Sequence, residues 1–417
     1  MLVSAYLYPW DVDDDPAAAD RIAGLGLDGV VLAAAYHAVR AVTPFHPRHR
    51  IVTRDAAVYY RTDPARWRGA ALRPAEADPR GSFERAAARL IAAGLRVSAW
   101  AVLAHGCGVG AANPSWHVRN AYGDGYPWAL CIGSPEVRDY VAALAAEVAA
   151  LGDAGGVELE ACGWYGIDHG SVHDKTAGAA VGPAAEWLLS VCFCTACSDA
   201  YRQAGADPEE LRAAVRVALD TELGWGGAAS QAPADAGELL SSSAADAGKL
   251  LPSSADAGGS LSSSADTGSM APSAADVLLR VRADVAERAA RQAIAAVRAA
   301  APGKQVLVHA HPDPRAAGSN PGHDPSVLLG PGGADGIVLS CSDPATAGQL
   351  VARTAAAAPP GARIAASLQA VSGLGGRPET LSEQAETVRA AGATELRLYH
   401  AGLASASDLA RIRSLRS

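Results

Sequence analysis

Two glutamates separated by one residue are the most chemically suggestive pair in this sequence. Glu158 and Glu160 fall within the apolar run 155–161, which predicts a β-strand. Alternate side chains of a strand point to the same face, so the two carboxyl groups should lie together. Carboxyl groups near the end of a buried strand can donate and accept protons in catalysis. The structural alternative is an acidic pair neutralised by an interior arginine.

Three cysteines form the most specific local motif. Cys192, Cys194 and Cys197 have C-x-C-x-x-C spacing, and the other cysteines are Cys107, Cys131, Cys162 and Cys341. Three thiolates at this spacing can converge on one tetrahedral Zn²⁺ that takes a fourth ligand from elsewhere in the chain. The alternative is a set of small, buried hydrophobic side chains. The spacing favours a closed structural zinc site that holds the loop after the fourth strand.

Histidines, aromatic residues and a few other polar residues follow several predicted strands. We predict a substrate-binding set of Asp11, Tyr36, His37, Trp100, His105, Trp164, His169, His173, His309, His311, Gln369, Tyr399 and His400. Any one of them can be a structural, hydrogen-bonded side chain. Together they describe a polar, aromatic bowl, which suits sugars because rings stack on sugar faces and polar groups bond the hydroxyls.

The elements that must position these residues alternate regularly along the chain. Short apolar runs predict strands at 2–8, 29–35, 96–103, 155–161, 305–310, 336–340, 363–368 and 395–399. Stretches rich in Ala and Arg predict helices at 16–25, 82–93, 135–151, 183–203, 274–300, 344–358, 379–391 and 405–415. This alternation is typical of a parallel α/β sheet. Eight units with short returns favour a closed (β/α)₈ TIM barrel, whose working face is at the strand C-termini. A doubly wound open sheet is the alternative.

A repeated phrase marks the entry to several strands. Gly-Leu-Asp-Gly-Val-Val-Leu occupies 26–32, Gly-Ala-Asp-Gly-Ile-Val-Leu occupies 333–339, and Gly-Ala-Thr-Glu-Leu-Arg-Leu occupies 392–398. We expect the leading glycine to end the preceding helix in the left-handed conformation, so that the strand starts at once.

The chain of 417 residues is long for one domain but fits a single barrel spanning 1–417 with two insertions. The insertion at 40–81 follows the second strand and is rich in Arg, Pro and Tyr. The insertion at 227–273, after the helices that follow strand four, repeats a low-complexity Ser/Ala/Asp/Gly phrase. Such a composition cannot bury enough apolar surface to offset chain entropy, which predicts disorder there.

Overall charge and composition exclude several partners. The net charge of −9 and the absence of a basic stripe argue against a nucleic-acid partner. No apolar run is long enough for a membrane span, and the N-terminus reads as a strand without a secretion leader. An odd total of seven cysteines, without disulfide-framework spacing, favours a reducing compartment. We therefore expect a cytoplasmic protein with a small-molecule or oligosaccharide substrate.

The segment Cys-Ile-Gly-Ser-Pro-Glu-Val-Arg-Asp-Tyr at 131–140 carries a family resemblance. It resembles the loop-to-helix step after strand three in barrel glycoside hydrolases, and it is especially similar to bacterial β-galactosidases with a four-cysteine zinc cluster. The likeness covers about residues 96–200. It implies that Cys131, Cys192, Cys194 and Cys197 bind zinc. It also implies that Glu160, at the end of strand four, is the general acid, while Glu158 orients a substrate hydroxyl or tunes the pKa of Glu160.

The second carboxylate departs from that family. The β-galactosidases use a nucleophilic glutamate at the end of strand seven, where this chain has Gln369, whose amide cannot attack. Asp343 after strand six and Asp11 after strand one are the remaining carboxylates at this face. A water-activating base at Asp343 would make the enzyme inverting. Asp168 and Asp174 are further candidates.

Three other functions stay open at this point. His309-Ala310-His311 could present two imidazoles to a catalytic metal, as in a metal-dependent hydrolase. The glycine-rich segments 372–376 and 401–402 lie where barrels bind phosphate, which would suit a phosphosugar. The barrel could also bind carbohydrate without cleaving it, because the strand-seven acid is absent. The favoured prediction is a glycoside-hydrolase-like enzyme with Glu160 as proton donor.

Overall fold

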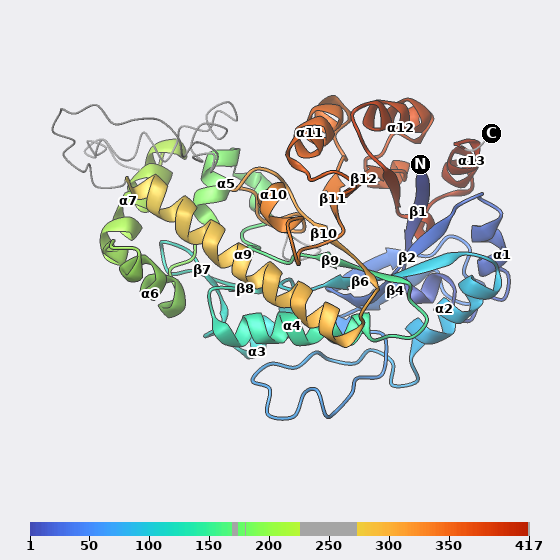
Figure 1. Cartoon of the computed structure of the whole chain (residues 1–417), viewed down its shortest axis with the longest axis horizontal. Helices are drawn as coiled ribbons and strands as arrows, with labels where there is room; N and C mark the ends of the chain where they lie inside the picture. The colour runs from blue at the N-terminus through green and yellow to red at the C-terminus, as the bar shows by residue number, and fades with distance from the viewer. Residues whose placement is uncertain (169–173, 180, 226–272, 416–417) are drawn as a thin grey trace.

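Parallel strands form a closed barrel in the computed structural model, which describes residues 1–168, 174–179, 181–225 and 273–415 (Figure 1). The barrel strands are β1 (Leu2–Leu7), β2 (Gly29–Tyr36), β6 (Arg96–Val102), β9 (Gly156–Glu160), β10 (Gln305–His309), β11 (Gly336–Ser340), β12 (Arg363–Gln369) and β13 (Glu395–Tyr399). Each strand pairs with the next in this order, and β1 pairs with both β2 and β13. This closure confirms the predicted (β/α)₈ barrel and rules out the open sheet.

Helices surround the barrel. They are α1 (Ala18–Ala23), α2 (Ser82–Ala92), α3 (Cys107–Ala112), α4 (Pro135–Ala149), α5 (Pro183–Leu189), α6 (Thr195–Gln203), α7 (Pro208–Glu222), α9 (Ala274–Ala300), α10 (Pro325–Leu328), α11 (Pro344–Ala357), α12 (Leu381–Ala390) and α13 (Ala406–Ser414). Short 3₁₀ turns occur at Pro9–Asp11, Thr176–Gly178, Ser372–Leu374, Pro378–Thr380 and Ala401–Leu403. The long helix α9 runs beside α4, and α4 packs on β6 and β9 (Figure 1).

The predicted strands and most helices are present within a few residues, but the helix predicted over 183–203 is wrong. The chain breaks between α5 and α6, because the cysteine motif occupies the connecting turn and Cys194 has an extended conformation as the N-cap of α6. Helices α3, α7 and α10 were not predicted. Nor were the hairpins β3 (Val39–Val42) with β4 (Ile51–Arg54) and β7 (His117–Arg119) with β8 (Gly125–Leu130).

The repeated phrase works as a strand start. Gly26 and Gly392 have positive φ angles of 76° and 112°, as expected. In the copy at 333–339, the preceding residue Gly332 rather than Gly333 is left-handed. The side chain of the third residue of each phrase accepts a hydrogen bond from a backbone N–H near the start of a neighbouring strand. Val3 donates to Asp28 at 2.8 Å, Val306 to Asp335 at 2.7 Å, and Ile364 to Thr394 at 2.9 Å. Each phrase therefore fixes the register of two adjacent strands.

The insertion after β2 is tied to the barrel by one buried carboxylate. It contains β3, β4 and the short strand β5 (Ala57–Val58), which adds to β2 in antiparallel fashion. Glu147 on α4 is 5% exposed and accepts hydrogen bonds from the insertion. The donors are Tyr60 Oη at 3.0 Å, the Asp63 backbone N–H at 2.6 Å and Trp67 Nε1 at 2.8 Å. The Glu147 carboxylate thus accepts three hydrogen bonds from one loop.

Glu147→Gln is expected to destabilise the protein by about 3 kcal/mol, because the amide turns an NH₂ group toward buried donors that then lack an acceptor. Denaturant unfolding at neutral pH measures the change. Asp139→Asn is the matched control, an exposed carboxyl on the same helix, and should stay within about 0.5 kcal/mol of the wild type. Equal stabilities for the two variants would contradict the anchoring role of Glu147.

Segment 227–272 of the predicted disordered insertion lies outside the described residues, and Ser273 caps the start of α9. No helix in the described part of the chain has the length and apolar character that crossing a membrane requires.

Candidate active site

A column of charged side chains occupies the barrel axis below its C-terminal mouth. Glu158 is 1% exposed, and its Oε1 accepts from Arg397 Nε at 2.6 Å. Arg397 also binds Glu395 at 2.8 Å, and Glu395 binds Arg363 at 2.5 Å. Tyr6 donates its hydroxyl to Glu158 Oε2 at 3.1 Å. The structural alternative considered from the sequence, a carboxylate neutralised by an interior arginine, therefore describes Glu158.

Glu158 is held ionised in this column. Burial alone would raise the pKa of Glu158, but Arg397 and His309 outweigh it and lower that pKa from 4.5 to about 2. A carboxyl group with so low a pKa carries no proton near neutral pH. Glu158 can therefore orient neighbours and supply negative charge, but it cannot serve as the general acid.

Arg397→Met is expected to cost about 3–5 kcal/mol at neutral pH, because Glu158 would remain buried without its counter-charge. The lowered pKa contributes stability that is complete above pH 4.5 and is lost as the pH falls toward about 2. The difference between wild type and variant should therefore shrink over that range. Urea unfolding at several pH values measures it.

Arg363→Met is the control for that experiment. The Arg363 side chain is 43% exposed in its salt bridge with Glu395, so solvent screening should limit the loss to about 1 kcal/mol or less. A gap between wild type and Arg397→Met that does not change with pH would contradict the role assigned to the Glu158 charge.

Glu160 lies one layer higher, at the C-terminal end of β9. It is 7% exposed, and its Oε2 accepts from Trp100 Nε1 at 2.7 Å. His309 stands between the two carboxyl groups, with Nδ1 3.9 Å from Glu160 and Nε2 3.5 Å from Glu158. The predicted shared face of Glu158 and Glu160 is therefore present. Of the two, Glu160 is the one at the end of the strand, where barrels expose side chains to the C-terminal face.

Aromatic rings surround these carboxyl groups. Tyr36 and Trp100 are in edge contact with centroids 4.7 Å apart, and the Tyr36 hydroxyl lies 3.3 Å from that of Tyr399. His37 stacks on Tyr36 at 4.1 Å and on His105 at 4.4 Å. These predicted residues form one continuous cluster, in which Tyr36, Trp100 and His105 are buried and His37 and Tyr399 are partly exposed.

Sequence reasoning missed four members of this region. Tyr6 contacts Trp100 at 4.6 Å, Tyr8 contacts Tyr36 at 5.0 Å, and Tyr165 stacks on His105 at 4.1 Å. Arg397 is the fourth. The alternation that paired Glu158 with Glu160 also places Tyr6 and Tyr8 on one face of β1 and its exit, so the signal for these two was present.

One side of the mouth carries small and uncharged residues. Ser340 at the end of β11 is exposed, and Ser367 and Gln369 on β12 are partly exposed. Ala365 belongs to the apolar cluster inside the barrel, so alternation turns Ser367 and Gln369 inward as well. The Gln369 Oε1 atom is buried without a hydrogen-bond partner among the described residues. The end of β12, where the resemblance noted in the sequence implied a nucleophilic carboxylate, therefore carries an amide.

Asp11 and His400 form a second buried pair next to the mouth. Asp11 Oδ2 accepts from the Tyr8 N–H at 2.8 Å and lies 3.9 Å from His400 Nδ1, while Tyr8 stacks on His400 at 4.2 Å. Burial raises the pKa of Asp11 to about 7 and lowers that of His400 to about 3. A side chain at Gly402 would overlap Asp11. The pair is thus enclosed by Tyr8 and the chain after β13.

Several predicted site residues lie apart from this cluster. Trp164 packs toward α9, where its Nε1 donates to the Arg282 carbonyl at 2.9 Å. Asp343 is an exposed N-cap of α11 that accepts from Ala345 and Thr346. Asp168 and His311 are half-buried in the loops after β9 and β10, and Asp174 follows a segment that is not described. His169 and His173 lie outside the described residues.

The structure argues against a catalytic metal at His309 and His311 and against a phosphate site after β12. Within the described ranges the four cysteines are the one group of three or more His, Cys, Asp or Glu residues arranged to hold a metal, so His309 and His311 share no such centre. In the glycine-rich segment after β12, Ser372 donates to the carboxylate of Asp408 at 3.1 Å. That negative charge disfavours a phosphate there.

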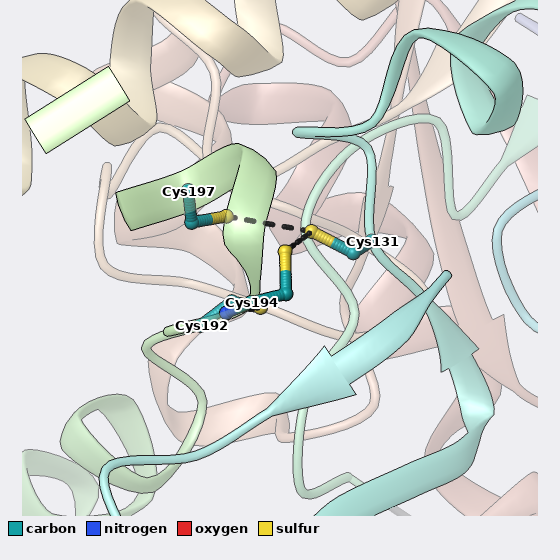
Figure 2. Close-up of side chains that lie close together, drawn as sticks. All are labelled: Cys131, Cys192, Cys194 and Cys197. Atoms are coloured by element: carbon teal, nitrogen blue, oxygen red, sulfur yellow. Dashed lines mark hydrogen bonds between the residues drawn. The ribbon is translucent and has the colours of Figure 1, made fainter. Parts of the chain in front are cut away.

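The cysteine cluster has the form expected of a metal site. Figure 2 shows Cys131 facing Cys194 and Cys197, with sulfur separations of 3.5 and 3.4 Å. All four sulfurs, including that of Cys192, lie within 4.8 Å of one another. Zinc–sulfur bonds of about 2.3 Å in a tetrahedron require sulfurs about 3.8 Å apart. The donor set and spacing therefore fit one Zn²⁺.

The surroundings of the cluster support a closed structural site. All four cysteines are buried, and none forms a disulfide. The Arg119 and Cys194 N–H groups both point at Cys192 Sγ at 3.4 Å, which stabilises a thiolate. A side chain at Gly133 would come within 2.8 Å of Cys197 Sγ. Four protein ligands leave no open position, so a metal here would join Cys131 to the α5–α6 turn rather than act in catalysis.

Comparisons with known proteins identify the architecture. No protein-family model and no curated protein matches the chain. The glycoside hydrolase domain of PgaB (BpsB) from Bordetella bronchiseptica matches with 17% identity and a TM-score of 0.53, covering 100% of this chain and 98% of that one. A β-galactosidase from Marinomonas ef1 matches with 10% identity and a TM-score of 0.53, over 100% of this chain and 59% of the other.

A further match is α-L-fucosidase isoenzyme 2 from Paenibacillus thiaminolyticus, with 14% identity, a TM-score of 0.53 and coverage of 100% and 49%. This chain thus spans roughly half to three fifths of the β-galactosidase and the fucosidase. At these identities the likeness establishes the fold, a barrel like that of glycoside hydrolases, and the resemblance noted in the sequence holds at that level.

Proposed function

We propose that this barrel is a glycoside hydrolase in which Glu160 is the general acid. The observation that carries the proposal is the placement of Glu160 at the C-terminal end of β9, beside His309 and held by Trp100. Strand ends at this face are where barrel enzymes keep their catalytic groups. The glycoside hydrolase titles of the matching structures support the same reaction class.

In this proposal each residue of the column has a distinct role. Glu160 protonates the glycosidic oxygen as the bond to the leaving sugar breaks. Glu158 stays ionised against Arg397 and orients His309, which lies within 4 Å of both carboxyl groups. In this proposal a sugar ring stacks on His37 and Tyr399, which are partly exposed, while the buried rings of Tyr36 and Trp100 support them.

The base or nucleophile that complements Glu160 is not assigned. Asp343 was the sequence-based candidate, but its capping hydrogen bonds to α11 and its exposure favour a structural role. Asp11 is close to the mouth, yet it is enclosed against His400 and Gly402. The proposal therefore consists of a structural Zn²⁺ at the four cysteines and an acid at Glu160.

A second candidate function follows from Gln369. Because an amide replaces the carboxylate at the end of β12, the same bowl could bind carbohydrate without hydrolysing it. A panel of aryl glycosides, measured for turnover, and calorimetric titration with the corresponding free glycans separate the two. Turnover supports the hydrolase, binding without turnover supports the binding module, and the absence of both contradicts a carbohydrate function.

A further inference from the structure

A buried arginine without a carboxylate partner lies next to the cysteine cluster. Arg282 on α9 is 1% exposed, and its Nη1 donates to the Ser190 carbonyl at 3.0 Å. Its Nε and Nη2 atoms have no hydrogen-bond partner in the described part of the chain. Burying a guanidinium without a compensating charge costs several kcal/mol. The Trp164 ring, 4.7 Å from the guanidinium, offsets part of this cost, and a negative group nearby would offset the rest.

The groups near Arg282 that can take up negative charge are the cysteine thiols, because Arg282 Nη1 donates to the carbonyl of Ser190, two residues before Cys192. Burial lowers the pKa of Arg282, and the neighbours that oppose this lowering are Tyr201, Cys197, Cys192 and Cys131. The Tyr201 phenol is itself buried and its pKa is raised well above 10.0, so it is neutral near pH 7. The thiol groups are left as the source of the compensating charge.

The charge of the cluster depends on whether it holds a metal. Four neutral thiols would carry no charge and would leave Arg282 uncompensated. Four thiolates around a divalent cation carry a net charge of −2, and a buried anion of that size requires a cation close by. We infer that Arg282 is the counter-cation of a divalent metal–tetrathiolate centre at Cys131, Cys192, Cys194 and Cys197. The inference rests on the proposed metal site and is independent of the proposed hydrolysis.

The same arginine connects the metal site to the candidate active site. Its guanidinium lies 4.7 Å over the ring of Trp164, and the Trp164 Nε1 donates to its carbonyl at 2.9 Å. Trp164 belongs to the segment that leaves β9 directly after Glu160. The contacts of Arg282 to Ser190 and Trp164 thus join the α5–α6 turn, α9 and the exit of β9. Arg138, another cation near Cys131, is only half-buried and donates to the Ile132 and Gly133 carbonyls.

The test measures zinc affinity by competition with a chromophoric chelator. Arg282→Met removes the charge and keeps an apolar stem of similar length. We expect its zinc dissociation constant to rise by about 10–100-fold, the range typical of groups that support metal ligands from behind. Arg282→Lys keeps the positive charge and should lose less affinity than Arg282→Met. Arg280→Met, an exposed arginine on the same helix, should match the wild type.

Thermal unfolding with and without zinc gives a second readout. If Arg282 compensates the metal centre, Arg282→Met should destabilise the zinc-loaded protein more than the metal-free one. If Arg282→Met fails to fold, Arg282→Lys decides: affinity within about 10-fold of wild type supports the inference, and a 100-fold loss overturns it. The inference is also overturned if the wild type binds no divalent metal, if Arg282→Met keeps wild-type affinity, or if Arg280→Met loses as much.

Discussion

Glu160→Gln is expected to lower turnover of aryl glycosides by about 10²–10⁴-fold, because the amide has the shape of the carboxyl group but no acidic proton to transfer. The Trp100 N–H, now 2.7 Å from Glu160 Oε2, can still donate to the amide oxygen. The melting temperature and the zinc content should therefore not change. Activity, metal analysis and thermal unfolding on one preparation test all three expectations.

The leaving group makes this experiment specific for the proton donor. An acidic phenol leaves a glycoside as its phenolate without protonation. The variant should therefore lose little activity on dinitrophenyl glycosides and much more on simple phenyl glycosides. Asp324→Asn is the matched carboxyl-to-amide control, an exposed N-cap of α10, and should keep wild-type turnover. A uniform loss on all leaving groups would show that Glu160 is not the acid, and full activity would remove it from the mechanism.

Loss of the metal is expected to destabilise the whole protein. Cys197→Ala removes one of four ligands, so the protein should lose its zinc and at least about 3 kcal/mol of stability, since structural zinc contributes binding free energy to folding. For a chain of 417 residues that loss lowers the melting temperature by about 3 °C. A strong chelator should have a comparable effect on the wild type. Metal analysis and scanning calorimetry measure both.

Cys341→Ala is the control for that experiment. Cys341 is 1% exposed, like the cluster cysteines, but it lies outside the cluster. Its replacement should keep the full zinc content and cost about 1 kcal/mol for the small cavity. A wild-type protein whose melting temperature is the same with and without zinc would contradict a structural metal site at these cysteines.

The sequence alone determined the features that depend on local backbone geometry. Strand alternation placed Glu158 and Glu160 on one face, and the hydrogen-bonded column confirms that shared face. The predicted strand bounds agree with the observed ones to within a few residues, because the apolar pattern and the Gly-rich phrases mark where strands begin. The C-x-C-x-x-C spacing identified three of the four clustered cysteines for the same reason. These signals all lie within a few residues of one another in the chain.

Only the tertiary structure decided which distant groups meet. Arg397 lies 239 residues from Glu158, and this contact makes Glu158 a buried ion rather than a proton donor. Trp164, predicted for the bowl, packs instead on Arg282, which is 118 residues away. The local sequence carries no signal for such pairs, because barrel closure brings the strands together and the desolvation of each charge is set by the whole interior. The protonation state of each candidate residue therefore follows from the folded barrel, whereas its position on the strand follows from the sequence.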